Sequence, residues 1–141
     1  MTISIDIPIT TIMTKHIISV DIKDGLARAE HLFKKHNIRH MPVTDHKKIV
    51  GMLSMNDLLR ISFADGAYRE EGDIQSDIYE MFNVKNLMVR TPETISPKNT
   101  VREVTSLLTN RKFHALPVVD GEEIVGMVTT TDLLKYYLSM F

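Results

Sequence analysis

The chain contains the same stretch twice, and this internal duplication limits the fold more than any other feature of the sequence. Residues 42–59 read PVTDHKKIVGMLSMNDLL, and residues 117–134 read PVVDGEEIVGMVTTTDLL, so the two copies align without a gap at an offset of 75 positions. Residues outside these stretches repeat at the same offset, including Met13 with Met88. The sequence therefore predicts two copies of one supersecondary unit.

The size of the chain and its composition limit the fold and the partners further. The chain has 141 residues, of which 43% are hydrophobic, so it can bury an ordinary core. One copy alone is of a size that folds only marginally, so we expect the two halves to share a core. A net charge of −1 provides no basic field for a phosphate backbone and argues against nucleic acid as a partner. The absence of cysteine excludes disulfides, thiolate metal sites and cysteine nucleophiles.

Nothing in the sequence indicates a membrane or a secreted location. No apolar run approaches the roughly 18 to 20 residues needed to cross a bilayer. Residues 1–10 lack the basic start of a secretion signal. These features favour a cytoplasmic protein with no membrane partner.

Each copy has the pattern of strand, helix, strand, strand and helix. In the first copy, Asp24 occupies an N-cap position, and apolar residues follow it at helical spacing as far as Asn37, a residue tolerated at a helix end. Ser54 is placed to cap the last helix. The expected elements are a strand at 17–20, a helix at 24–36, strands at 38–44 and 48–53 joined by a turn at 45–47, and a helix at 55–61.

The second copy repeats this order after an acidic connector. Asp120 and Gly121 form one of the strongest short hairpin signals. The expected elements are a strand at 93–95, a helix from 99 or 100 to 111, strands at 114–119 and 123–128, and a helix at 130–139. We divide the chain into a first repeat with an N-terminal arm (1–62), a connector (63–85) and a second repeat (86–141). The pattern in the connector predicts a helix at 74–82, and the connector is a candidate mobile lid or interface element.

Both copies place a hydroxyl at the end of a strand and a carboxylate three residues later. The pairs are Ser54 with Asp57 and Thr129 with Asp132. One interpretation is a capping box, in which each side chain satisfies a backbone amide of the other residue. The other is a ligand site, because helix N-termini bind anions and a carboxylate can accept from the hydroxyls of a ribose. The two interpretations are compatible.

The repeated motifs resemble a known family. The runs RHMPVTD and HALPVVD, followed by GMLSMND and GMVTTTD, are similar to those of a tandem pair of CBS domains, also called a Bateman module. The resemblance covers about residues 10–138. It implies an α/β fold of two pseudo-symmetric β-α-β-β-α repeats packed face to face. It also implies clefts that bind AMP, ADP, ATP or S-adenosylmethionine, and a homodimer of two such modules.

The resemblance assigns residues to two clefts. The first is formed by Thr129, Thr131, Asp132 and His114, with an opposite wall of His16, Ile18, Ile38 and Arg39. The second cleft is formed by Ser54, Asn56, Asp57, Arg39 and His40, with a wall of Thr91, Glu93 and Phe113. Ile18 can pack against an adenine, whereas its counterpart Glu93 brings a carboxylate toward the ligand. We therefore expect the Asp132 cleft to be occupied and the second cleft to be weaker.

The sequence contains no motif for catalysis. It lacks a Walker or dinucleotide-binding loop, a nucleophile elbow and a zinc-protease helix. The histidines between residues 31 and 46 straddle a helix end, a strand and a turn, so we expect no metal site. The preferred hypothesis is a non-enzymatic sensor that needs no cofactor, binds an adenosyl nucleotide as its ligand and acts through an unknown effector protein. The alternative is a ligand-free dimerisation or interaction module, and an enzyme acting on nucleotides is a weaker third.

Overall fold

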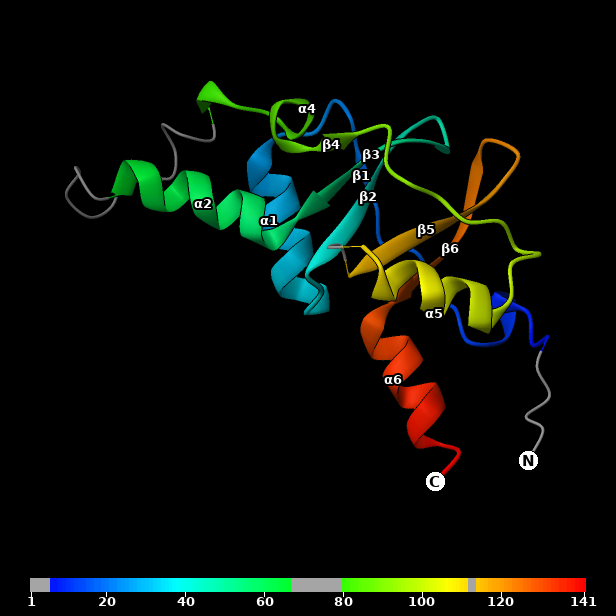
Figure 1. The fold of residues 1–141 in the computed structure, drawn as a ribbon. Helices are drawn as coiled ribbons and strands as arrows, with labels where there is room; N and C mark the ends of the chain where they lie inside the picture. Colours follow the sequence, from blue (N-terminus) through cyan, green and yellow to red (C-terminus); the bar gives the residue numbers. More distant parts are fainter. Residues whose placement is uncertain (1–5, 67–79, 112–113) are drawn as a thin grey trace. The chain divides into compact units, whose positions relative to one another are not determined.

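The structure, a computed structural model, describes residues 6–66, 80–111 and 114–141, except for the side chains of residues 62–66. It confirms an α/β protein with two β-α-β-β-α repeats (Figure 1). The chain divides into two compact units. The first-repeat unit is Ile18–Pro92, and the second-repeat unit combines Met1–Ile17 with Glu93–Phe141.

The first-repeat unit is built on a β-hairpin. It contains β1 (Val20–Asp21), α1 (Leu26–His36), β2 (His40–Asp45), β3 (Lys48–Ser54), α2 (Met55–Gly66), α4 (Val84–Leu87) and β4 (Val89–Arg90). β2 and β3 are antiparallel, β1 joins β2 in parallel, and β4 joins β3 antiparallel. Helices α1 and α2 contact each other. Their apolar residues, such as Phe33 and Leu58, are buried with Met41, Val43 and Leu53 of the hairpin.

The second-repeat unit has the same hairpin and the same two helices. It contains η1 (Ile9–Thr11), α5 (Val101–Thr109), β5 (Ala115–Asp120), β6 (Glu123–Thr129) and α6 (Thr130–Leu138). β5 and β6 begin and end 75 positions after β2 and β3, and the register shift at Val43 and Thr44 recurs at Val118 and Val119. The duplicated sequence therefore folds into duplicated structure.

Each unit is completed by the segment that precedes the other repeat. We call residues 6–17 and 83–92 the lead-in segments. In the second-repeat unit the Val101 amide donates to the Ile7 carbonyl (2.8 Å), and Ile9 is fully buried. In the first-repeat unit Val84 is fully buried. The buried residues that the structure describes form two clusters, one in each unit, and the expectation of a core shared by the two halves stays a prediction. The boundaries that we drew at 62 and 86 stay a prediction.

The first strand of each repeat is shorter than the sequence indicates. The strand expected at 17–20 is β1, which starts at Val20 and pairs with only two residues of β2. The strand expected at 93–95 is reduced to one parallel bridge between Ile95 and Val118. β-branched residues favour extended backbone, but the length of a strand is set by the partner available to it. The sequence patterns did not predict the short elements α4 and β4.

The helices agree with the sequence apart from one cap and from α2, which runs to Gly66 instead of ending at residue 61. The N-cap of α1 is Gly25 rather than Asp24, because the Asp24 carboxylate accepts from the Asp21 amide (2.9 Å) instead. The helix ends at Asn37, whose φ of 51° is the left-handed conformation expected there. α5 starts after Thr100, which forms a capping box with Glu103.

Most of the connector lies outside the described residues, and so does most of the helix expected at 74–82. Its proposed roles as a lid or interface element stay predictions. Of the helices within the described ranges, none has the length and apolar character needed to cross a membrane.

Candidate functional site

The first candidate motif lies where β3 passes into α2. The Asp57 amide donates to Ser54 Oγ (3.1 Å), and the Ser54 amide donates to Asp57 Oδ2 (3.3 Å). The Ser54 hydroxyl also donates to the same carboxylate oxygen (2.8 Å). The pair thus forms the reciprocal bonds of a capping box, which satisfies amides that a helix start leaves without partners.

The second motif has the same geometry where β6 passes into α6. Thr129 is the N-cap; its Oγ1 accepts from the Asp132 amide (3.2 Å), and its own amide donates to Asp132 Oδ2 (2.9 Å). The capping interpretation is therefore confirmed for both motifs. Capping uses only Oδ2 of the Asp132 carboxylate, so Oδ1 can still accept a hydrogen bond from a ligand.

A backbone hydrogen bond holds one basic or titratable residue beside each motif. The Met55 amide donates to the Arg39 carbonyl, and the Thr130 amide donates to the His114 carbonyl, both at 2.9 Å. Arg39 and His114 are exposed. A guanidinium or imidazole close to the positive end of a helix favours an anionic group.

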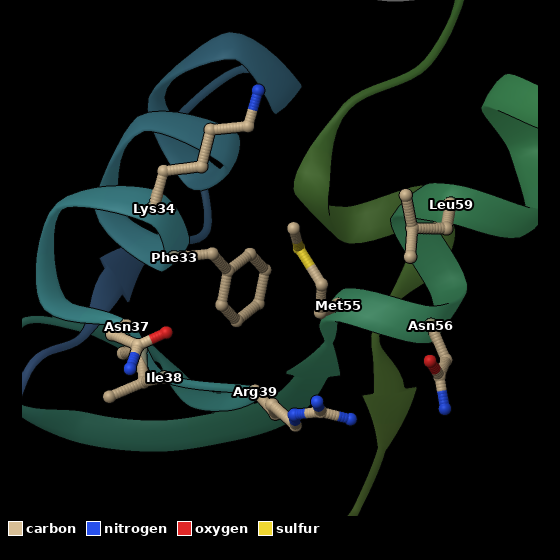
Figure 2. A pocket seen from close by; sticks show the side chains of 8 residues that line it. All are labelled: Phe33, Lys34, Asn37, Ile38, Arg39, Met55, Asn56 and Leu59. Carbon is tan, nitrogen blue, oxygen red and sulfur yellow. The ribbon is translucent and has the colours of Figure 1, made fainter.

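A pocket of about 400 Å³ opens in the first-repeat unit, between the end of α1 and the start of α2. Its lining consists of Phe33, Lys34, Asn37, Ile38, Arg39, Met55, Asn56 and Leu59 (Figure 2). Figure 2 shows the Phe33 ring and the Met55 side chain facing each other across the middle. The pocket thus combines an apolar centre with the cation of Arg39, whereas the Lys34 ammonium is paired with Glu30 and points away from that centre. An apolar surface beside a guanidinium suits a ligand with an apolar ring and an anionic group.

Three of these lining residues, Ile38, Arg39 and Asn56, were expected at a ligand site from the sequence. The other five were not. The repeated motif contains the start of α2 but not the end of α1, so the contribution of α1 had no motif to mark it. The apolar helical spacing between Asp24 and Asn37, to which Phe33 belongs, was the only available signal.

The residues expected in the Asp132 cleft are divided between the units. Thr129, Thr131, Asp132, His114 and His16 belong to the second-repeat unit, and Ile18, Ile38 and Arg39 belong to the first-repeat unit. The structure brings His114 beside the Thr129 motif. Within the described residues, no hydrogen bond or ion pair joins His16 to that motif. The assignment of this cleft stays a prediction.

The residues expected in the second cleft are mostly in one unit. Ser54, Asn56, Asp57, Arg39, His40 and Thr91 belong to the first-repeat unit, and Glu93 belongs to the second-repeat unit. His40 is paired with Ser54 across the β2–β3 hairpin. Phe113 lies outside the described residues. This assignment also stays a prediction.

Glu93 was expected to weaken its cleft by its charge. In the structure its carboxylate Oε2 lies 3.2 Å from Nε of Arg111. Both side chains are at least one-third exposed, so such a pair contributes only about 0–1 kcal/mol. The negative charge nevertheless has a neighbouring counter-charge, which the sequence did not indicate.

His46 Nδ1 lies 2.8 Å from Asp45 Oδ1 in the hairpin turn. In residues 6–66, 80–111 and 114–141, no three side chains of His, Asp or Glu are placed to hold a metal ion.

Comparison with known proteins identifies the repeated unit. The family model described as the CBS domain matches residues 9–64 and again residues 84–139. The inosine-5'-monophosphate dehydrogenase of Korarchaeum cryptofilum is 28% identical over 120 residues, which make up 84% of this chain and 22% of that protein. The chain spans less than half the length of the first curated relatives that it matches.

Solved structures share the fold along nearly the whole chain. The complex of CBSX2, an Arabidopsis thaliana protein, with AMP has a TM-score of 0.78 and 23% identity, and the match covers 95% of this chain and 98% of that one. The CBS domain pair of protein MJ0100, in complex with 5'-methylthioadenosine and S-adenosyl-L-methionine, has the same TM-score, identity and coverage. At this identity the likeness carries the fold alone.

Proposed function

The chain belongs to the CBS domain family, with two CBS domains at residues 9–64 and 84–139, and from this premise we propose that it is a regulatory module that binds an adenosine compound. The ligand class is AMP, ADP, ATP or S-adenosylmethionine. Support comes from the AMP bound to CBSX2 and the adenosyl compounds bound to the MJ0100 pair. The module acts without catalysis, as a homodimer in the cytoplasm, and passes its signal to an effector protein.

The observation that carries this proposal is the pair of equivalent hydroxyl–carboxylate motifs at the start of α2 and α6. Each motif lies beside a group suited to phosphate, Arg39 in one unit and His114 in the other. In each motif the carboxylate accepts hydrogen bonds from the ribose hydroxyls. The backbone amides at the helix start and the neighbouring Arg39 or His114 side chain bind the phosphate. We assign the main site to Asp132, with Thr129 and Thr131 contributing hydroxyls. Binding then shifts the protein between two arrangements by the difference in its affinity for them.

A thermal-shift panel followed by calorimetry tests the proposal. The panel contains AMP, ADP, ATP and S-adenosylmethionine, with GTP as the control for a purine nucleotide of another base. A ligand present at 100 times its Kd stabilises the folded state by about 2.7 kcal/mol. We expect a shift for at least one adenosyl compound and its loss in Asp132→Asn. A panel in which no adenosyl compound exceeds GTP contradicts the proposal.

A second function, a ligand-free dimerisation or interaction module, is favoured by the exposed apolar residues of α6. Leu134 and Leu138 lie four positions apart on this helix, and they are 66% and 72% exposed. Exposed apolar side chains on one helix face are typical of protein contact surfaces. If the module works in this way, Leu134→Glu with Leu138→Glu lowers the mass measured by light scattering, and adenosyl compounds change nothing.

A further inference from the structure

The two motif carboxylates have different numbers of hydrogen-bond and ion-pair partners within the protein. In the first-repeat unit, Asp57 Oδ1 lies 3.2 Å from Nη2 of Arg60, and Oδ2 accepts from the hydroxyl and amide of Ser54. In the second-repeat unit, Asp132 Oδ2 accepts from the Thr129 amide. Among the described residues, no donor or cation reaches Asp132 Oδ1.

The difference arises at one repeated position, three residues after each carboxylate. Arg60 stands there in the first repeat and Lys135 in the second. Residues three apart lie on the same face of a helix, so either cation could pair with its aspartate. The guanidinium is a flat fork that suits a carboxylate, whereas the ammonium is a compact, strongly hydrated charge. In the described part of the chain Lys135 is exposed and makes no ion pair.

We propose that Arg60 is a built-in competitor for the ligand, which holds the Asp57 carboxylate and so directs the vicinal hydroxyls of the nucleoside to Asp132. This inference rests on the proposed function, because it concerns the same two motifs. A vicinal diol donates up to two hydrogen bonds, and an ionised carboxylate accepts them at about four lone-pair positions on its two oxygens. Asp132 offers one oxygen without a partner, whereas Asp57 must first release Arg60.

The expected change in ligand affinity follows from the solvent exposure of the Arg60–Asp57 ion pair. The Arg60 side chain is 76% exposed and the Asp57 side chain 21%. An exposed pair of this kind is weak, so its release lowers the affinity of the Asp57 motif by only about two- to fivefold. That difference in affinity is enough for the ligand to prefer the Asp132 motif over an otherwise equivalent Asp57 motif.

A different role for Arg60 predicts a different result. A cation close to the ligand could attract its phosphate, and removing it would then weaken the binding of AMP. Adenosine has the same diol but no phosphate. Comparing adenosine with AMP therefore separates competition for the carboxylate from attraction of the phosphate.

The test uses calorimetry on the full chain carrying Asp132→Asn, which leaves Asp57 as the remaining motif carboxylate. We expect Arg60→Ala in this background to tighten adenosine binding about two- to fivefold. Arg28→Ala is the matched control, because it removes an exposed cation of the same unit, from α1, with the same change in net charge. The reciprocal change, Lys135→Arg with Asp57→Asn, is expected to weaken adenosine binding by a similar factor.

Unchanged or weaker adenosine binding in Arg60→Ala overturns the inference, and so does an equal gain in Arg28→Ala. Weaker AMP binding with unchanged adenosine binding also overturns it and assigns Arg60 to the phosphate. Failure of the proposed function is seen separately, in the parent protein. There it appears as an absence of binding, or as binding that neither Asp132→Asn nor Asp57→Asn reduces.

Discussion

Met88 packs over Gly51, and its side chain fills the space that a Cβ atom on that glycine would need. The backbone carbonyl of Val89 lies on the same side, 3.0 Å from that position. The second-repeat unit repeats the arrangement, with Met13 over Gly126. In each unit, therefore, a lead-in segment is packed directly against the backbone of the hairpin.

Gly51→Ala is expected to destabilise the protein by about 1–3 kcal/mol, because the new methyl group displaces Met88 and presses on a backbone atom. Urea denaturation measures the change. Gly25→Ala is the matched control, since a Cβ at Gly25 meets nothing within 4 Å. Because Gly25 is the N-cap of α1 and alanine caps a helix less well than glycine, this control should cost no more than about 1 kcal/mol. Equal stability of the two variants would show that the Met88 contact does not restrict this site.

Thr129→Ala and Thr131→Ala separate capping from ligand binding. Thr129 caps α6, so its loss should lower the free energy of unfolding by about 1 kcal/mol. Thr131 is exposed and makes no side-chain hydrogen bond to a described residue, so Thr131→Ala should change stability by less than about 0.5 kcal/mol. If Thr131 binds the ligand, the same variant weakens adenosyl binding about three- to tenfold. Unchanged binding would remove Thr131 from the proposed site.

Glu103 makes the stability of α5 sensitive to acid. The Thr100 amide donates to the Glu103 carboxylate (2.9 Å), and Asn99 donates more weakly (3.4 Å), which lowers the pKa of Glu103 below its usual value. A carboxyl with a lowered pKa stabilises the folded state above its usual pKa of about 4.3, and this contribution is lost as the pH falls through the lowered value.

We expect Glu103→Gln to reduce the loss of stability between pH 6 and pH 3, as followed by urea denaturation at each pH. Glutamine keeps the capping geometry but cannot titrate. The control is Glu123→Gln, a change of equal charge at an exposed position at the start of β6. A pH profile of Glu103→Gln that coincides with that of the parent would contradict the assignment.

Tyr137→Phe should destabilise the second-repeat unit by about 1 kcal/mol. The Tyr137 hydroxyl lies 2.8 Å from Thr105 Oγ1, which itself donates to the Val101 carbonyl, so this bond connects α6 to α5. Tyr136→Phe removes a hydroxyl from the adjacent ring, and the Tyr136 hydroxyl has no hydrogen bond to a described residue; this variant should be neutral. Thermal denaturation compares the two, and equal melting temperatures would argue against the Tyr137 bond.

The duplicated hairpins and helices could be predicted because each signal occurs twice. Pro42 and Pro117, like Gly51 and Gly126, occupy equivalent positions within the hairpin strands, and the two capping pairs mark equivalent helix starts. Local patterns are sufficient for such elements, since the partners lie close together in the sequence. The motif residues of the candidate site were found for the same reason.

The lead-in segments could not be predicted in the same way. The repeat relates Met13 to Met88 and Gly51 to Gly126, but it does not say which methionine meets which glycine. Met13 contacts Gly126 rather than Gly51, the glycine of the repeat that follows it directly. The pairing of Arg60 with Asp57 and the absence of such a pair at Asp132 were equally hidden, because Arg and Lys are equivalent in a charge pattern and differ only in geometry.

The exchange of lead-in segments has a consequence for how such a chain can be divided. A chain with a single repeat has only its own lead-in, so it would have to obtain the missing segment from a second molecule, at a cost that depends on concentration. Joining two copies makes the donor part of the same chain and replaces the protein concentration by a fixed effective concentration. Separate fragments carrying residues 1–66 and 80–141 would accordingly depend on each other to fold, as the halves of a split protein do.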